Sequence, residues 1–162
     1  MRRLTIIIDS REQKPFEFPR YQVLVRKLKI GDYSVLGLET RICVERKSFN
    51  DLFGTYTKGR ERFLRQLKLM SKIDRSYLVV ECSVADVMAG HPRTVVRGPL
   101  LFEMVLETCR AFGVIPLFCS DRGAARDVTE FLLERTRMRP RAIKGGPNNA
   151  MSRRNKQVYG ES

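Results

Sequence analysis

The sequence predicts an α/β sandwich built around a mixed β-sheet. Two patterns carry this prediction: short apolar runs of strand length follow one another early in the chain, and later runs alternate with segments whose apolar residues recur at helical spacing. Length and composition agree, because 162 residues of which 43% are hydrophobic can build one sizeable core. We expect the sheet to begin as an antiparallel meander and to continue with parallel strands.

The first part of the chain is predicted to supply four strands. Each is a short run rich in apolar or β-branched residues, bounded by turn residues. In chain order they are residues 4–8, 21–27, 33–38 and 41–46. The first stops at Asp9 and so delivers polar side chains to the C-terminal end of a buried strand. The last two follow a turn at Gly31 and Asp32 and form a hairpin with Gly37 near its reversal.

The rest of the chain alternates helices with strands. The predicted helices either repeat apolar residues at spacings of three and four or are short turns closed by glycine and proline. They are residues 60–73, 84–89, 99–112 and 121–137. In the first of them, Phe63, Leu67 and Met70 form the apolar stripe, and the outer face is basic. Residues 77–80 and 114–119 are apolar runs of strand length.

Positive charge dominates the whole chain. There are 31 Lys and Arg against 18 Asp and Glu, a formal net charge of +13. Residues 135–162 hold eight basic residues and one acidic residue, so the preceding part is basic as well. A polyanionic partner, nucleic acid in the first place, fits this excess because Lys and Arg release the counterions condensed on phosphates. We expect a domain over residues 1–138 and a basic, disordered tail over residues 139–162, whose composition is that of a linker.

Several classes of protein are excluded or disfavoured. The longest uncharged stretch, residues 111–120, has ten residues, whereas a membrane span needs about 20. The four cysteines form no C-x-x-C pair, which favours buried, reduced thiols and a cytoplasmic protein, associated with the nucleoid in a prokaryote. The one histidine, His91, precedes a proline in a predicted loop, so catalysis by a Ser/His or Cys/His pair is poorly supported.

Three residues around the predicted hairpin carry the clearest chemical signal. Glu45 and Lys47 stand two apart on a predicted strand, so they project from one face about 6.6 Å apart, and the hairpin folds Asp32 back toward them. Two carboxylates and an ammonium there form the kind of site that Mg²⁺ takes, because Mg²⁺ binds through one or two carboxylates together with substrate phosphates. Taken alone, the same spacing also occurs by chance on a solvated strand.

Three separated motifs agree in order and spacing with one known family. They are residues 6–12 (IIIDSRE), 31–33 (GDY) and 44–52 (VERKSFNDL). G-D, a variable stretch and E-R-K-x-x-x-D form the signature of the XPF-family nuclease domain, which the chain resembles over about its first 135 residues. The chain is most similar to the stand-alone, single-domain members found in bacteria and phages.

The resemblance implies a restriction-endonuclease-like α/β/α sandwich with a central mixed sheet. It also implies hydrolysis of DNA phosphodiesters with Mg²⁺ or Mn²⁺, with Asp32 and Glu45 as metal ligands and Lys47 as the catalytic lysine. The other implied residues complete the acidic site, orient its ligands or contact DNA phosphates from a helix. They are Asp9, Arg11 and Glu12 for the acidic site, Arg46 and Asp51 for support, and Arg60, Arg62 and Arg65 for DNA.

Alternatives remain for some of these residues. Arg46 and Asp51 would otherwise form a surface ion pair, Arg62 would lie on a solvated helix face, and either Arg60 or Arg62 matches the family arginine. The resemblance also implies a homodimer formed through the late helices. Phe102, Leu106, Phe131 and Leu132 are candidates for its interface, or else for the core.

The predicted activity is a structure-selective DNA endonuclease acting on branched, flapped or single-stranded DNA. The alternative is a non-catalytic DNA-binding or scaffold subunit of a nuclease complex, and an RNA substrate stays open because phosphate contacts carry no information about the sugar. Family members that cut forks and flaps usually carry a tandem helix-hairpin-helix domain. Here a basic tail follows instead, so a separate DNA-targeting protein is a further predicted partner.

Overall fold

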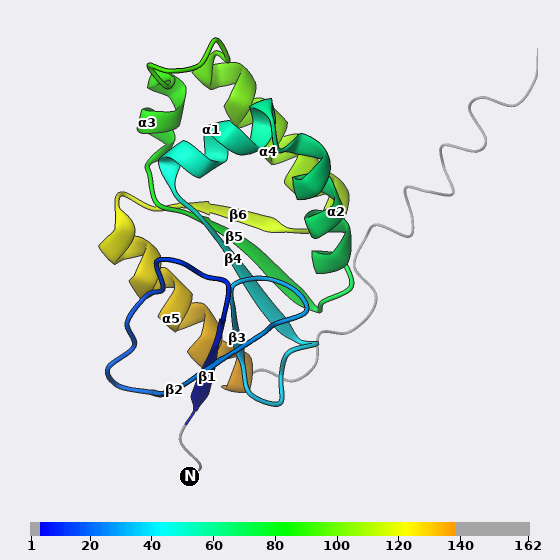
Figure 1. The fold of residues 1–162 in the computed structure, drawn as a ribbon, viewed down its shortest axis with the longest axis vertical. Helices are drawn as coiled ribbons and strands as arrows, with labels where there is room; N and C mark the ends of the chain where they lie inside the picture. Colours follow the sequence, from blue (N-terminus) through cyan, green and yellow to red (C-terminus); the bar gives the residue numbers. More distant parts are fainter. Residues whose placement is uncertain (1–3, 139–162) are drawn as a thin grey trace, which may run out of the picture.

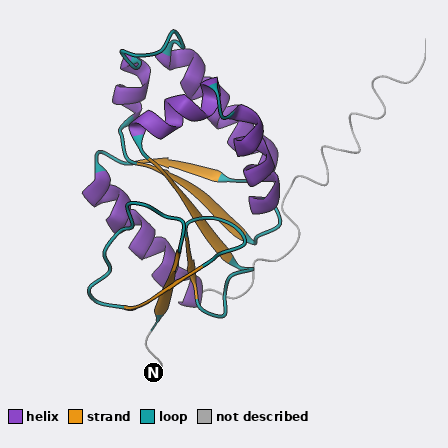
Figure 2. Ribbon diagram, in the orientation of Figure 1, coloured by secondary structure: helices purple, strands orange, loops and turns teal. Residues whose placement is uncertain are grey.

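The computed structural model describes residues 4–138 and shows a six-stranded mixed sheet between two helical layers (Figures 1 and 2). The strands are β1 (Thr5–Asp9), β2 (Gln22–Arg26), β3 (Tyr33–Val35), β4 (Ile42–Lys47), β5 (Arg75–Val80) and β6 (Ile115–Phe118). The helices are α1 (Phe49–Thr57), α2 (Arg60–Met70), α3 (Val84–Ala89), α4 (Gly98–Phe112) and α5 (Arg122–Met138). The predicted α/β/α sandwich with a central mixed sheet is therefore confirmed.

Each face of the sheet has its own apolar core. Residues of α1, α2, α3 and α4 pack with Cys43, Leu78 and Val80 on one face. On the other face, Ala125 and Leu133 of α5 pack with residues of β1, β3, β4 and β5. Figure 1 shows the same division, with α5 on one side of the sheet and the other helices opposite. Alternate residues of a strand point to opposite faces, so β4 and β5 contribute to both cores.

The strand order differs from the expected meander at one place. The sheet runs β2-β1-β3-β4-β5-β6, and β2 pairs with the outer side of β1 in parallel. The antiparallel pairs are β1 with β3 and β3 with β4, after which β4, β5 and β6 are parallel as expected. The cause is the segment after β1, whose buried Phe16 and Phe18 pack against Tyr33 while the chain crosses back to the start of β1. A parallel neighbour needs such a crossover.

Helix α1 is absent from the predicted elements, which pass directly from the strand at residues 41–46 to the helix at residues 60–73. Its N-cap is Ser48, whose hydroxyl accepts a hydrogen bond from Asp51 N at 3.2 Å and donates one to Asp51 Oδ2 at 2.6 Å. Leu52, Phe53 and Tyr56 bury its inner face. The Ser-x-x-Asp spacing is the available signal for a helix start, although the helix is short and contains Gly54.

The remaining expectations from the sequence concern cysteines, membrane spans and the chain end. Cys43, Cys82, Cys109 and Cys119 are buried and unpaired, as predicted. Within residues 4–138, no helix has the length and apolar character needed to cross a membrane. The predicted basic tail over residues 139–162 lies outside the described residues, so its boundary with the domain stays a prediction.

Candidate active site

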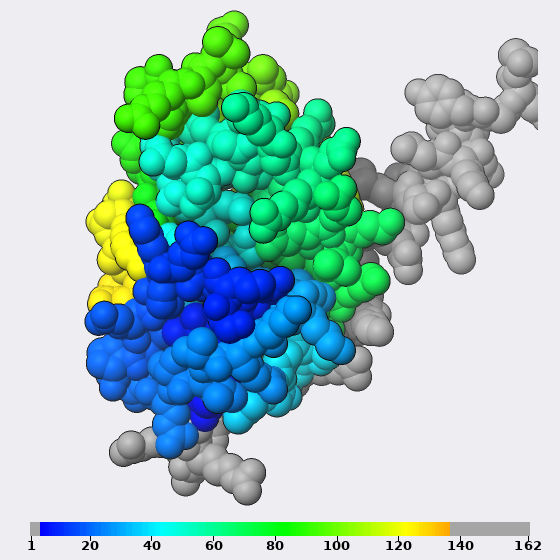
Figure 3. All heavy atoms as spheres, in the orientation of Figure 1, coloured from blue at the N-terminus to red at the C-terminus, as the bar shows by residue number. Residues whose placement is uncertain are grey.

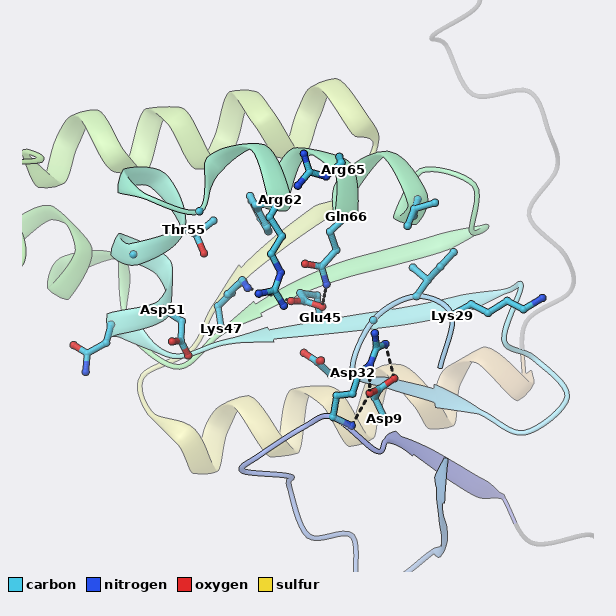
Figure 4. A pocket seen from close by; sticks show the side chains of 18 residues that line it. Asp9, Lys29, Asp32, Glu45, Lys47, Asp51, Thr55, Arg62, Arg65 and Gln66 are labelled. Atoms are coloured by element: carbon cyan, nitrogen blue, oxygen red, sulfur yellow. Dashed lines mark hydrogen bonds and ion pairs between the residues drawn. The ribbon is translucent and has the colours of Figure 1, made fainter. Parts of the chain in front are cut away.

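The C-terminal end of β4 sends chemically different side chains to the two faces of the sheet. Glu45 and Lys47 face the side covered by α1 and α2, where they line a cleft of about 730 Å³ (Figure 4). Arg46 points to the opposite side, where it pairs with Glu81, which also pairs with Arg122 of α5. Eight of the predicted site residues line this cleft: Asp9, Arg11, Asp32, Glu45, Lys47, Asp51, Arg62 and Arg65. In the space-filling view of Figure 3, the N-terminal residues lie below the region of α1 and α2.

The Gly31–Asp32 turn places a carboxylate between β1 and β4. Asp32 N donates to Val44 O at 2.9 Å, and Asp32 O accepts from Asp9 N at 2.8 Å, so one residue joins both strands. Gly31 has φ +74°, and a Cβ there would lie 2.3 Å from Cys43 Sγ. Glycine is therefore required twice over, by the backbone conformation and by the close approach to β4.

Glu45 is almost enclosed, with 4% of its surface exposed. Lys47 Nζ lies 3.2 Å from Glu45 Oε1, and the Gln66 side-chain amide of α2 donates to Glu45 Oε2. The Lys47 ammonium also lies 5.4 Å from the ring centre of Phe63, within range of a cation–π interaction. Strand β4 and helix α2 together thus determine the position of the carboxylate.

Burial and the negative charge of neighbouring carboxylates raise the pKa values of Asp32 and Glu45. Burial, followed by the charge of Asp32, raises the pKa of Glu45 to about 8. Burial raises the pKa of Asp32 to about 6, although a hydrogen bond from Arg46 N to Asp32 Oδ2, 2.8 Å long, acts in the opposite direction. Two partly desolvated carboxylates that repel each other form a site that a cation would stabilise.

The donor set fits a hard divalent cation. Asp32 and Glu45 offer carboxylate oxygens, the ligands that Mg²⁺ prefers, and both line the cleft. Within the described part of the chain, no group of three or more His, Cys, Asp or Glu side chains is arranged to hold a metal ion. Two protein carboxylates suit Mg²⁺, which usually keeps several waters and binds substrate phosphates in its remaining positions.

Asp9 also lines the cleft, but its carboxylate is fully engaged by its own surroundings. It accepts hydrogen bonds from Arg11 N (2.7 Å), Arg11 Nε (2.8 Å), Arg11 Nη2 (2.9 Å) and Leu28 N (2.7 Å). The side-chain hydrogen bonds from Arg11 are the main reason that the pKa of Asp9 lies below its usual value. Asp9 therefore links the end of β1 to the segment before Asp32 and stays ionised.

Behind β4, Arg46 joins two acidic side chains in a closed ionic cluster. Its guanidinium lies 3.1 Å from Glu12 Oε1 and 2.9 Å from Glu81 Oε1, and Glu81 Oε1 also lies 2.6 Å from Arg122 Nη1. Burial acts to lower the pKa of Arg46, but the bonds to Glu12 and Glu81 outweigh it and raise the pKa. The alternative of a surface ion pair between Arg46 and Asp51 is not what the structure shows.

The arginines of α2 divide into two groups. Arg62 and Arg65 line the cleft, and Figure 4 shows Arg62 reaching down toward Glu45 and Lys47. Arg60 is exposed and is not part of the cleft lining. Asp51 is at the cleft rim and bonds to Ser48 in the N-cap of α1.

Four residues of the cleft or of the ionic cluster were not predicted from the sequence to belong to the site. Gln66 and Lys29 line the cleft, and Glu81 and Arg122 complete the ionic cluster. Gln66 lies one helical turn after Arg62, and Glu81 ends a predicted strand, so both had a local signal. Arg122 had none, because its partners lie 41 or more positions away in the sequence.

Comparison with known proteins agrees with this geometry. The family model described as "ERCC4 domain" matches residues 8–132, which include the end of β1, the Gly31–Asp32 turn and the E-R-K motif. The chain belongs to the ERCC4 domain family. The resemblance to the XPF-family nuclease domain is thereby confirmed, and the chain is a member of a family of DNA nucleases.

Solved structures similar to this ERCC4 domain include XPF from Aeropyrum pernix, with 18% identity and a TM-score of 0.65 over 98% of this chain and 75% of that one. The same protein in a complex with DNA matches with 18% identity and a TM-score of 0.66, covering 99% and 76% of the two chains. At this identity the likeness establishes the fold. No curated protein sequence matches the chain.

Proposed function

We propose that this ERCC4 domain is a divalent-metal-dependent, structure-selective endonuclease that hydrolyses phosphodiester bonds in branched, flapped or single-stranded DNA. The observation that carries the proposal is the meeting of Asp32, Glu45 and Lys47 in one cleft whose rim holds Arg62 and Arg65. DNA as the substrate is supported by the basic chain and by the similar XPF structure, which is a complex with DNA.

Asp32 and Glu45 would hold Mg²⁺ or Mn²⁺, which supplies Lewis-acid stabilisation of the charge that develops on the phosphate. Lys47 has the position of a cationic partner for the scissile phosphate or the attacking water, because its ammonium lies 3.2 Å from Glu45 Oε1. The amide of Gln66 restrains the other oxygen of Glu45, so a single orientation of that carboxylate is favoured before substrate arrives.

The other residues bind substrate or hold the site in shape. Arg62 and Arg65 contact backbone phosphates from α2, and Arg62 is therefore our choice over Arg60 as the family arginine. Asp9 acts with Arg11 to hold the end of β1, and Glu12 and Arg46 brace β4 from behind. Asp51 supports the site by bonding to Ser48, the N-cap of α1, the helix that forms one end of the cleft.

The test is cleavage of a labelled panel comprising single strand, duplex, 3′ flap, fork and four-way junction, in DNA and in RNA, with Mg²⁺, Mn²⁺ or EDTA. We expect metal-dependent cutting of at least one single-stranded or branched DNA and its loss in Glu45→Gln. Cutting of RNA alone would contradict DNA as the substrate. Binding without cutting on every member of the panel would instead favour the non-catalytic scaffold subunit.

The proposed function also implies protein partners and a place of action in the cell. We propose a homodimer formed by late helices, since Leu106 of α4 is 40% and Phe131 of α5 is 55% exposed. Phe102 packs against Phe118 and Leu132 against the α5-side core, so the other two candidates serve the fold. A separate DNA-targeting protein would direct junction choice. As a DNA enzyme, the protein would act in the cytoplasm, at the nucleoid of a prokaryotic cell. Sedimentation of the wild type and of Phe131→Asp tests the dimer.

A further inference from the structure

We propose that Arg122, in the first turn of α5, is a positioning residue of this active site. It lies outside the cleft and acts through Glu81 and Arg46, whose backbone holds Asp32. The inference rests on the proposed nuclease function and extends it to a helix on the opposite face of the sheet.

Arg122 contacts two segments of the chain outside its own helix. Its Nη1 lies 2.6 Å from Glu81 Oε1, and its Nη2 donates to Lys14 O at 2.9 Å and to Pro15 O at 3.0 Å. The guanidinium also lies 4.8 Å from the ring centre of Phe16. One side chain therefore joins α5 to the end of β5 and to the segment that follows β1.

A chain of ion pairs and hydrogen bonds connects Arg122 to the catalytic carboxylate of Asp32. Glu81 Oε1 is shared with Arg46 Nη1 at 2.9 Å, and Arg46 bonds to both oxygens of Glu12 through Nε and Nη2, at 3.2 and 3.1 Å. The backbone N of Arg46 donates to Asp32 Oδ2 at 2.8 Å. We infer that the ion pairs of the Arg46 side chain restrain this backbone group, so that a shift of Arg46 toward a new partner changes the orientation of Asp32.

The ionic cluster behind β4 is electrically balanced. Glu12 and Glu81 are balanced by Arg46 and Arg122, and the side chains of Glu12, Glu81 and Arg46 are at most 10% exposed. Without Arg122, one guanidinium would serve two desolvated carboxylates, and one negative charge would remain uncompensated behind Asp32 and Glu45. Such an uncompensated buried charge forces its neighbours to rearrange.

A purely structural role at the start of α5 does not account for these contacts. The helix is capped by Asp121, whose Oδ1 accepts from Ala124 N at 2.8 Å. Arg122 retains 44% side-chain exposure, so it contributes little to the apolar core. Its hydrogen-bonding partners are Glu81, which pairs with Arg46, and the carbonyl oxygens of Lys14 and Pro15, which precede Phe16.

Arg122→Gln tests the inference, with Arg126→Gln as the matched control. Arg126 is one helical turn away on the same helix, and in the described structure its side chain bonds to Asp127, so each substitution removes one positive charge. In single-turnover cleavage we expect Arg122→Gln to lower the rate of the chemical step by about 10- to 100-fold, the usual effect of losing a group that orients metal ligands. DNA affinity measured in EDTA should change by less than about threefold, and Arg126→Gln should match the wild type in both assays.

A wild-type cleavage rate in Arg122→Gln would overturn the inference, and so would a rate loss matched by an equal loss of DNA affinity, since Arg122 would then be a DNA contact. If Arg122→Gln does not fold, the balanced double variant Glu81→Gln/Arg122→Gln decides. A rate loss equal to that of Glu81→Gln alone supports a path through Glu81, whereas a clearly larger loss than that of Glu81→Gln contradicts it. A wild type that cuts nothing would overturn the proposed function itself, which separates that failure from this one.

Discussion

The two faces of β4 carry the same kinds of charged residue, but the charges are balanced on one face and unbalanced on the other. In the cleft, burial raises the pKa values of both Asp32 and Glu45, and the charge of Asp32 raises that of Glu45 further. Behind the strand, Arg46 lies between acidic partners, and its ion pairs hold its pKa above the ordinary value despite burial. The balanced cluster stabilises the fold, and the unbalanced pair has electrostatic capacity left for a cation and a phosphate.

The largest expected effect comes from neutralising the unbalanced side. Glu45→Gln or Asp32→Asn should reduce cleavage by on the order of 10³-fold or more, because a cation ligand is lost while the shape is kept. Salt-sensitive DNA binding should persist, since the basic surface supplies it independently. Cleavage and fluorescence-anisotropy binding measure the two effects. The exposed Glu103→Gln on α4 is the control, and loss of binding in a folded Glu45→Gln would contradict this separation of roles.

Removing charge from the balanced side should instead cost stability. Arg46→Met leaves Glu12 and part of Glu81 buried without a cation, so the free energy of unfolding should fall by about 3 kcal/mol or more. Urea unfolding measures it. The control is Arg26→Met, which breaks the exposed ion pair with Glu39 and should cost less than about 1 kcal/mol. Equal losses in the two variants would show that the cluster behind β4 is no more important than a surface pair.

The cleft side of β4 should make folding stability depend on pH. A carboxyl whose pKa is higher in the folded protein keeps its proton while the unfolded chain has lost it, so folding stability falls as pH rises between the two values. For Glu45 this window runs from 4.5 to about 8. In EDTA, Glu45→Gln should therefore be more stable than the wild type at pH 9, by on the order of 2 kcal/mol, with the difference vanishing near pH 4. Thermal unfolding across pH measures this, and a constant difference at all pH values would contradict it.

The smallest expected effect belongs to the rim of the cleft. Arg62→Gln should weaken DNA binding severalfold and reduce the slope of log affinity against log salt by about 1, because one phosphate contact is lost. Arg60→Gln is the matched control on the same helix, outside the cleft lining, and should leave the slope unchanged. The reverse result in a salt titration would assign the phosphate contact to Arg60.

Local patterns were enough for much of the fold. Apolar runs predicted all six strands, and helical spacing predicted four of the five helices that the structure describes, with Gly113 ending α4 in the left-handed conformation. The missed helix, α1, is short and contains a glycine, and its best signal was the Ser48–Asp51 spacing. The parallel pairing of β2 depends on where Phe16 and Phe18 are buried, which periodicity does not reveal.

The candidate site divides in the same way. The two-residue alternation of a strand already placed Glu45 and Lys47 on one face, and the motif spacing brought Asp32 to them. Nothing in the spacing indicated that Gln66 would contact Glu45, or that Asp9 would be saturated by Arg11 and Leu28 N. Such contacts depend on how a helix packs against the sheet and on the path of a loop.

The sequence by itself therefore determined which residue types face each side of β4, because strand alternation is a property of the backbone. Only the tertiary structure decided what those residues do. It enclosed Glu45 and raised its pKa, and it gave Arg46 the partners Glu12, Glu81 and, through Glu81, Arg122. Burial and ion pairing depend on groups that are distant in the chain and adjacent only after folding, so the electrostatic difference between the two faces arises with the fold.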